Sequence, residues 1–198
     1  EDYFTSKFEV VKEFRLQASS LKMSRVNLAS DVLKSRKGND KERLNITYDE
    51  RLSMKELPKQ VLGFYKDIQE RFKDGEDYQE LENEKFTFKL AGLDHLYGFG
   101  GLHAAKTNYV GEGHFMQIDV KSYYPSLILN NSFLDGKAKD YYRAIYNDRK
   151  KLQQLDSPIE EAYKLILNIV YGGLKSKWTN LYNPQAANNV VVNGQLIL

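Results

Sequence analysis

The chain has 198 residues and a formal net charge of +2, with 41% hydrophobic and 28% charged residues. This balance is typical of a globular protein and excludes a disordered or membrane-spanning chain. No cysteine is present, which excludes a disulfide framework and a thiolate zinc site. No apolar stretch reaches membrane-spanning length, so we expect no membrane partner and a cytoplasmic location.

Residues 1–84 are expected to form a mainly helical N-terminal connector without catalytic residues. A helix is predicted around residues 21–33, and the polar stretch SRKGND after it is typical of an exposed loop. Apolar residues at helical spacing from 61 to 72 predict a second helix. The basic run at 34–43 is a candidate contact for a nucleic-acid backbone.

Residues 85–136 are expected to form a small antiparallel sheet and the start of a helix. The alternation of Phe86, Phe88 and Leu90 predicts a strand, and the glycine-rich stretch YGFGGLHAAK (97–106) predicts a turn.

Two further strands are predicted over His103–Val110 and Phe115–Val120, and a helix begins at Pro125. The second strand would be buried and would deliver Asp119 to the edge of the sheet. The histidines His103 and His114 lack a metal-ligand spacing and are expected to be ordinary strand residues.

Two antiparallel helices are predicted over residues 139–155 and 159–170, with the break at Ser157-Pro158. We place this helical pair in a region spanning 137–174, after which 175–198 returns toward the sheet. The expected fold class is α+β, with a small antiparallel sheet, a projecting two-helix element and the helical connector.

Two spaced motifs place phosphate- or metal-seeking groups beside tyrosines. The first, D-x-x-S-x-Y-P-S, consists of Asp119, Ser122, Tyr124, Pro125 and Ser126. The second, K-x-x-x-N-x-x-Y-G, consists of Lys164, Asn168, Tyr171 and Gly172. In a helix, the second set shares one face because its members lie at i, i+4, i+7 and i+8.

These motifs resemble motifs A and B of the family B DNA polymerases of phage type. The segment around Gly98 to Gly101 resembles the stretch before motif A, and VVVNGQLIL resembles the segment after motif B. The resemblance covers roughly residues 97–198. It implies that 85–136 is part of a polymerase palm, that 137–174 forms the fingers helices and that 175–198 returns to the palm.

The implied activity is template-directed addition of deoxynucleotides to a primer 3′ end by phosphoryl transfer with two Mg²⁺ ions. The resemblance makes Asp119 the catalytic metal ligand and adds the backbone carbonyl of Val120. Taken alone, Asp119 is better explained as the cap of a helix that begins near Tyr124 or as the end of a strand than as a metal ligand.

The resemblance also implies a site for the deoxynucleoside triphosphate. Tyr124 would pack under the sugar and exclude a 2′-hydroxyl, while the amides of Ser122 and Tyr123 would donate to phosphate oxygens. The implied clamps are Lys164 and Arg149, with Asn168 on a phosphate or a nearby backbone group. The residues themselves leave three alternatives open: Arg143 or Lys150 in the place of Arg149, a solvated face for Lys164, and core packing for both tyrosines.

Primer and template contacts are expected from a separate set. The flat surface at Tyr171 and Gly172 would pack against the nascent base pair. Further contacts are expected from Gly100, Gly101, Lys175 and Lys177. Trp178 adds an aromatic side chain to this basic segment, and the alternative is a loop with a core tryptophan.

No second acidic motif of the Y-x-D-T-D-S type occurs in the sequence, and we expect no early D-x-E pair on a strand of the kind that a proofreading exonuclease uses. We therefore expect a polymerase fragment whose partners are DNA primer–template, deoxynucleoside triphosphates and the remainder of the polymerase chain. By itself it should be inactive, a prediction that fails if the purified chain extends a primer. The alternative is a non-catalytic nucleic-acid-binding module, whereas a family A polymerase or reverse transcriptase would lack S-x-Y-P-S.

Overall fold

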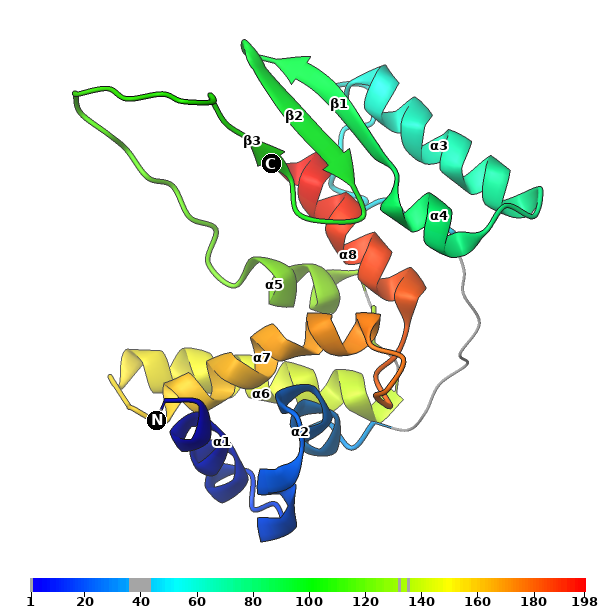
Figure 1. The fold of residues 1–198 in the computed structure, drawn as a ribbon. Helices are drawn as coiled ribbons and strands as arrows, with labels where there is room; N and C mark the ends of the chain where they lie inside the picture. Colours follow the sequence, from blue (N-terminus) through cyan, green and yellow to red (C-terminus); the bar gives the residue numbers. More distant parts are fainter. Residues whose placement is uncertain (1, 36–43, 132, 135) are drawn as a thin grey trace. The chain divides into compact units, whose positions relative to one another are not determined.

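The structure is a computed structural model that describes residues 2–35, 44–131, 133–134 and 136–198. Its fold is α+β, with helices and a three-stranded antiparallel sheet (Figure 1). Two compact units divide the chain, and each is described by itself. Unit 1 combines Glu1–Lys41 with Tyr124–Ala187, and unit 2 combines Glu42–Tyr123 with Asn188–Leu198. Within the described ranges, no helix has both the length and the apolar character that crossing a membrane requires.

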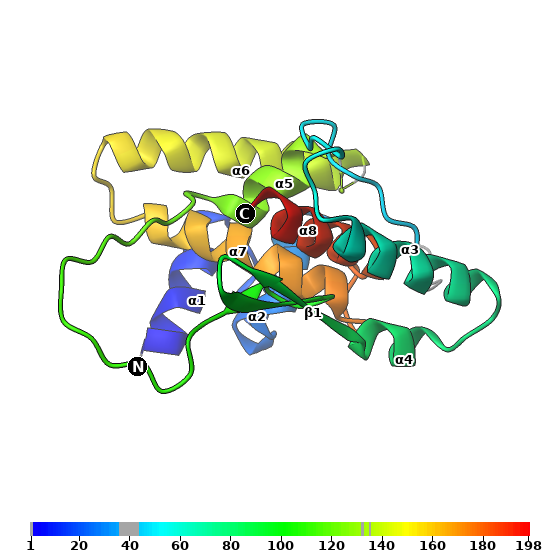
Figure 2. The same cartoon turned by 90° about the horizontal axis from the view of Figure 1, so that it is seen from above.

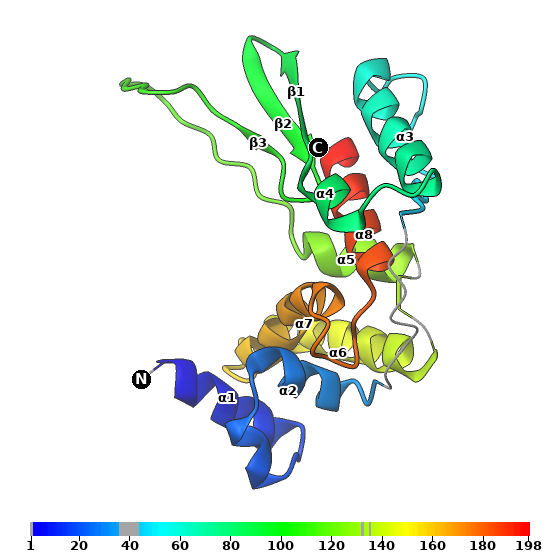
Figure 3. The same ribbon diagram turned by 45° about the vertical axis from the view of Figure 1, so that its right-hand side comes forward.

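Unit 1 is built around one central helix, α7 (Glu160–Lys175). Three helices pack against it (Figure 3): α1 (Asp2–Glu13), α2 (Arg25–Val32) and α6 (Gly136–Gln154). A 3₁₀ helix, η1 (Ala18–Lys22), links α1 to α2, and α5 (Tyr123–Asn130) precedes α6. One face of α7 is buried because its apolar residues recur at helical spacing, as in Ile166, Leu167, Val170 and Leu174.

The helices α6 and α7 form the predicted antiparallel pair. Tyr142 Oη donates to the carbonyl of Leu167 at 3.0 Å, and Arg149 Nε donates to Glu160 Oε1 at 2.6 Å. A later residue of α6 therefore contacts an earlier residue of α7, which shows that the two helices are antiparallel. The predicted break is also confirmed, since α6 ends at Gln154 and α7 begins at Glu160.

Unit 2 packs helix α3 (Lys59–Lys73) and the short helix α4 (Tyr78–Asn83) with the sheet. The sheet has the order β1-β2-β3, formed by β1 (Lys85–Leu90), β2 (Leu93–Gly98) and β3 (His103–Ala104). Its core includes Val61, Tyr65 and Ile68 from α3, together with Phe99 and Val192. The helix predicted from the 61–72 spacing and the strand predicted from Phe86, Phe88 and Leu90 are both confirmed.

The last helix, α8 (Pro184–Ile197), contributes its second part to unit 2. Buried amides on it hold the extended chain from Asn45 to Asp49. Asn189 accepts from the Thr47 amide at 2.7 Å, and Asn193 accepts from the Asp49 amide at 2.6 Å. Both side chains also donate to backbone carbonyls of this segment, so side chains and not a neighbouring strand pair with these backbone groups.

Two of the predicted strands are wrong. The strand expected over His103–Val110 stops at Ala104, and Asn108 then adopts a left-handed φ of 53° that a strand does not accommodate. Phe115–Val120 forms no strand in the described residues, and the exposed fractions of Phe115, Met116 and Ile118 are 80%, 86% and 81%. Figure 2 shows the segment as an open arc between β3 and α5.

The physical reason is hydrogen bonding between neighbours. Alternating apolar residues favour a strand, but a strand exists only where another chain segment supplies the ladder of N–H and C=O partners. No described residue forms a ladder with 105–122. The sequence analysis also missed β2. Only its last two residues fall in the stretch 97–106 that was interpreted as a turn, whereas Leu93–Gly98 pairs along its length with β1.

Candidate functional site

Asp119 lies in the exposed segment between β3 and α5, within unit 2. It is therefore not at the end of a buried strand, which corrects the predicted setting. Val120 beside it is 44% exposed. Across the part of the chain that the structure describes, no three His, Cys, Asp or Glu side chains gather into a group that could hold a metal ion. Asp119 thus offers one hard oxygen ligand, with the Val120 carbonyl next to it.

The turn after Asp119 has an unusual backbone. Ser122 adopts a left-handed φ of 53°, and α5 begins at the following residue. Such a conformation costs a residue with a Cβ about 1–2 kcal/mol. Tyr123 anchors the turn, because its Oη donates to the carbonyl of Gly194 at 2.5 Å. The turn thus enters a helix directly, as the sequence predicted for the Ser122 and Tyr123 amides.

The tyrosines of the two motifs lie together in unit 1. The ring centroids of Tyr124 on α5 and Tyr171 on α7 are 4.8 Å apart, with the planes tilted by 59°. Both side chains are partly exposed. Burial raises the pKa of the Tyr124 phenol, so the neutral form is favoured. The structure therefore joins one residue of the first motif to one of the second.

The second motif forms an exposed face of α7, as its spacing predicted. Asn168, Gly172 and Lys175 are exposed, while Lys164 and Tyr171 are partly exposed. Lys164 Nζ lies 3.0 Å from Glu161 Oε1, and its side chain is 43% exposed. A surface ion pair of this kind contributes about 0–1 kcal/mol, so the lysine can exchange its carboxylate partner for a phosphate.

The two adjacent glycines of α7 differ in their surroundings. A Cβ added to Gly172 would meet no atom within 4 Å. A Cβ added to Gly173 would lie 2.9 Å from Leu181 Cδ1 and 3.3 Å from Val26 Cγ1. Packing therefore explains Gly173 but not Gly172, which leaves a bare patch of backbone on the exposed face.

The contacts of Arg149 indicate a role in holding α6 and α7 together. Its side chain is 10% exposed and pairs with Glu160, which is 14% exposed and also accepts from Gln153. A triphosphate would have to displace this partner. The two alternatives on α6, Arg143 and Lys150, are exposed, and Lys150 Nζ lies 4.4 Å from the ring centroid of Tyr146.

The segment after α7 presents a basic and aromatic surface. Trp178 is 80% exposed, which overturns the alternative of a core tryptophan. Lys177 Nζ lies 5.3 Å from the Trp178 ring centroid, and both Lys175 and Lys177 are exposed. An exposed indole beside lysines can stack on an unpaired base while the lysines neutralise phosphates.

The glycine-rich stretch is held by a residue that the sequence analysis missed. Gln195 on α8 donates through Nε2 to the Gly100 carbonyl at 2.5 Å and accepts from the Gly98 amide at 3.4 Å. Gly98 is required sterically, because a Cβ there would lie 2.8 Å from the Glu84 carbonyl oxygen. Gly100 and Gly101 remain exposed after this anchoring. If VVVNGQLIL had been predicted as a helix, its spacing would have placed Gln195 on the same side as the buried valines.

Comparison with protein-family models, with curated proteins and with solved structures gives no match for this chain.

Proposed function

We propose that this chain is part of a template-directed, family B DNA polymerase that adds deoxynucleotides to a primer 3′ end. The observation that carries the proposal is the exposed face of α7, where Lys164, Asn168, Tyr171 and bare Gly172 stand together while the opposite face is core. Tyr124 joins this face by its ring contact with Tyr171. Positive charge, an amide and a flat aromatic patch are the groups that recognise a nucleotide.

Gly172 supports the proposal because it is energetically costly where it stands. Glycine within a helix is about 0.5–1 kcal/mol less favourable than alanine. No neighbouring atom requires it, since a Cβ would enter open space. A ligand that approaches the backbone closely explains the position, and a base pair lying flat on the helix is such a ligand.

In the proposed reaction, Lys164 binds triphosphate oxygens and the amides at Ser122 and Tyr123 donate to them. The left-handed Ser122 supports this role, because strained backbone is concentrated at functional sites. Arg149 is a weaker candidate than Lys164, because a buried carboxylate already pairs with it.

Magnesium enters the proposal through Asp119 and the Val120 carbonyl. Bound Mg²⁺ would neutralise charge on the attacking and leaving oxygens. Asp119 fits as one oxygen ligand, but the described residues do not gather three ligating side chains. Two ions would need further carboxylates, so we derive no step through them and expect no primer extension by the chain alone. The proposed setting is the cytoplasm of a bacterial host of a phage.

Equilibrium binding of a fluorescent deoxynucleoside triphosphate tests the proposal, in the presence of primer–template and Mg²⁺. Lys164→Ala and Asp119→Ala should each weaken binding. The matched control is Lys151→Ala, because Lys151 also pairs with an acid three residues away, Asp148, at 2.9 Å. Equal affinity of all four proteins would refute the proposed nucleotide site.

A second candidate function is a nucleic-acid-binding module without catalysis. Exposed Trp178 with Lys177 favours it, since this pair needs neither metal nor triphosphate to bind a strand. Tight binding of single-stranded DNA together with no measurable triphosphate binding would select this candidate.

A further inference from the structure

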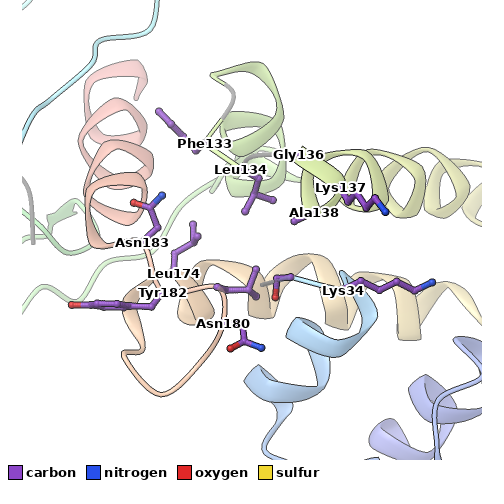
Figure 4. A pocket seen from close by; sticks show the side chains of 12 residues that line it. Lys34, Phe133, Leu134, Gly136, Lys137, Ala138, Leu174, Asn180, Tyr182 and Asn183 are labelled. Carbon is purple, nitrogen blue, oxygen red and sulfur yellow. The ribbon is translucent and has the colours of Figure 1, made fainter. Parts of the chain in front are cut away.

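A hollow of about 490 Å³ opens in unit 1. Figure 4 shows it between the end of α2, the start of α6 and the segment after α7. Its volume lies within the range of small-molecule sites, about 300–1,000 Å³. None of the residues used above for triphosphate or metal binding lines it.

Two lysines give the hollow a positive rim. Lys34 follows α2 and Lys137 lies in the first turn of α6, and Figure 4 shows both amines extending to the same side. Lys34 Nζ lies 5.1 Å from the ring centroid of Tyr141, one turn after Lys137. The rim therefore favours an anionic ligand.

The floor and wall favour a flat ligand with hydrogen-bonding edges. Phe133, Leu134 and Leu174 are buried apolar residues of the lining. Asn180 and Tyr182, from the segment after α7, also line the hollow, and Figure 4 shows the Tyr182 ring extending away from the other labelled side chains. An apolar floor with a few polar groups is the usual lining of a site for an aromatic ring.

We propose that this hollow holds one nucleotide of single-stranded nucleic acid, with the base on the apolar floor and the flanking phosphates at Lys34 and Lys137. A strand is favoured over a free nucleotide because the segment that supplies Asn180 and Tyr182 also carries Lys177 and exposed Trp178. That neighbour offers a second base a stacking surface. Such binding needs neither Mg²⁺ nor a triphosphate, so it does not depend on the proposed catalytic function.

Fluorescence anisotropy of a labelled eight-nucleotide thymidine strand tests the proposal without metal, at 50–200 mM salt. Each lost phosphate contact to a single strand makes the negative slope of log K against log salt shallower by about 0.7. The double variant Lys34→Ala/Lys137→Ala should therefore bind more weakly at 50 mM, and its slope should be shallower by about 1.4. Between 50 and 200 mM salt, the fold-loss of affinity should then be roughly sevenfold smaller for the double variant than for the wild type.

Two controls make the result decisive. Lys151→Ala removes one lysine charge from α6, as Lys137→Ala does, but outside the hollow, and it should leave the slope unchanged. Ala138→Phe keeps every charge but adds a ring to the lining, and it should weaken binding while circular dichroism shows a retained fold. A double variant with the wild-type affinity and slope would overturn the proposal. Thymidine monophosphate binding as tightly as the strand would overturn the assignment to a strand.

Discussion

Replacing Gly172 by alanine separates two effects of this glycine, its destabilisation of the helix and its proposed contribution to nucleotide binding. The added methyl group meets no atom within 4 Å, so only the helix propensity changes. Alanine is favoured by about 0.5–1 kcal/mol. For a protein of this size, 1 kcal/mol corresponds to about 2–4 °C in Tm. We expect Gly172→Ala to raise Tm by about 1–4 °C, measured by circular dichroism at several scan rates.

The same substitution should weaken nucleotide binding. A methyl group forced into a close contact typically costs about 1–3 kcal/mol. That corresponds to roughly fivefold or more in the affinity for a deoxynucleoside triphosphate on primer–template. The variant should therefore be more stable and bind less well, a combination that damage to the fold does not produce.

The neighbouring glycine is the matched control. Gly173→Ala gains the same propensity but places its Cβ 2.9 Å from Leu181 Cδ1, so overpacking of about 1–3 kcal/mol should make it less stable than Gly172→Ala. If Gly172→Ala is stabilised and binds nucleotide as the wild type does, the bare patch is not a contact surface. If Gly172→Ala lowers Tm, the methyl group meets neighbouring atoms, and the premise that a Cβ at this position enters open space is wrong.

Three further outcomes follow from the same contacts. Arg149→Ala should lower the free energy of unfolding, measured by urea titration, by about 3 kcal/mol, because it leaves the largely buried Glu160 carboxylate without this partner. Lys164→Ala should change the free energy of unfolding by less than about 1 kcal/mol. Equal effects of the two substitutions would contradict the burial of the Arg149–Glu160 pair. Trp178→Ala should leave the free energy of unfolding unchanged and weaken single-strand binding by about 1–3 kcal/mol. In the wild type, the bound strand should quench the tryptophan fluorescence, and an unquenched signal would contradict the stacking role of Trp178. Burial and the Glu13 carboxylate raise the pKa of Tyr163 to about 12, so the native state holds this proton more tightly than the unfolded chain does. The free energy of unfolding should therefore be unaffected below pH 10 and should fall between pH 10 and 12. Tyr163→Phe should reduce that fall, and a pH profile identical to that of the wild type would refute the assignment.

The elements that the sequence predicted correctly are those specified by local patterns. Helix α3 follows from apolar residues repeating at helical spacing. The boundary between α6 and α7 follows from the Ser157-Pro158 break, and the exposed face of α7 follows from the helical spacing of its motif. Strand β1 follows from the alternation of Phe86, Phe88 and Leu90. Each of these patterns is complete within one segment, so no distant residue decides the outcome.

The failures involve partners that a local pattern does not contain. Whether Phe115–Val120 forms a strand depends on a neighbouring strand, not on its own alternation. The ion pair of Arg149 joins two helices, and its burial is visible only once they pack. Asn193 and Gln195 bond to groups more than ninety positions earlier in the chain, so no pattern within their own segment identifies these partners.

Photo-crosslinking with an azido-substituted deoxynucleoside triphosphate tests the proposed nucleotide site most directly, with the modified peptides mapped by mass spectrometry. We expect labels in the α7 peptide that contains Lys164 to Lys175 and in the peptide that contains Asp119 to Ser126, both suppressed by unlabelled triphosphate. Labels confined to other segments, or labels that excess triphosphate does not suppress, would contradict the assignment of these motifs to nucleotide binding.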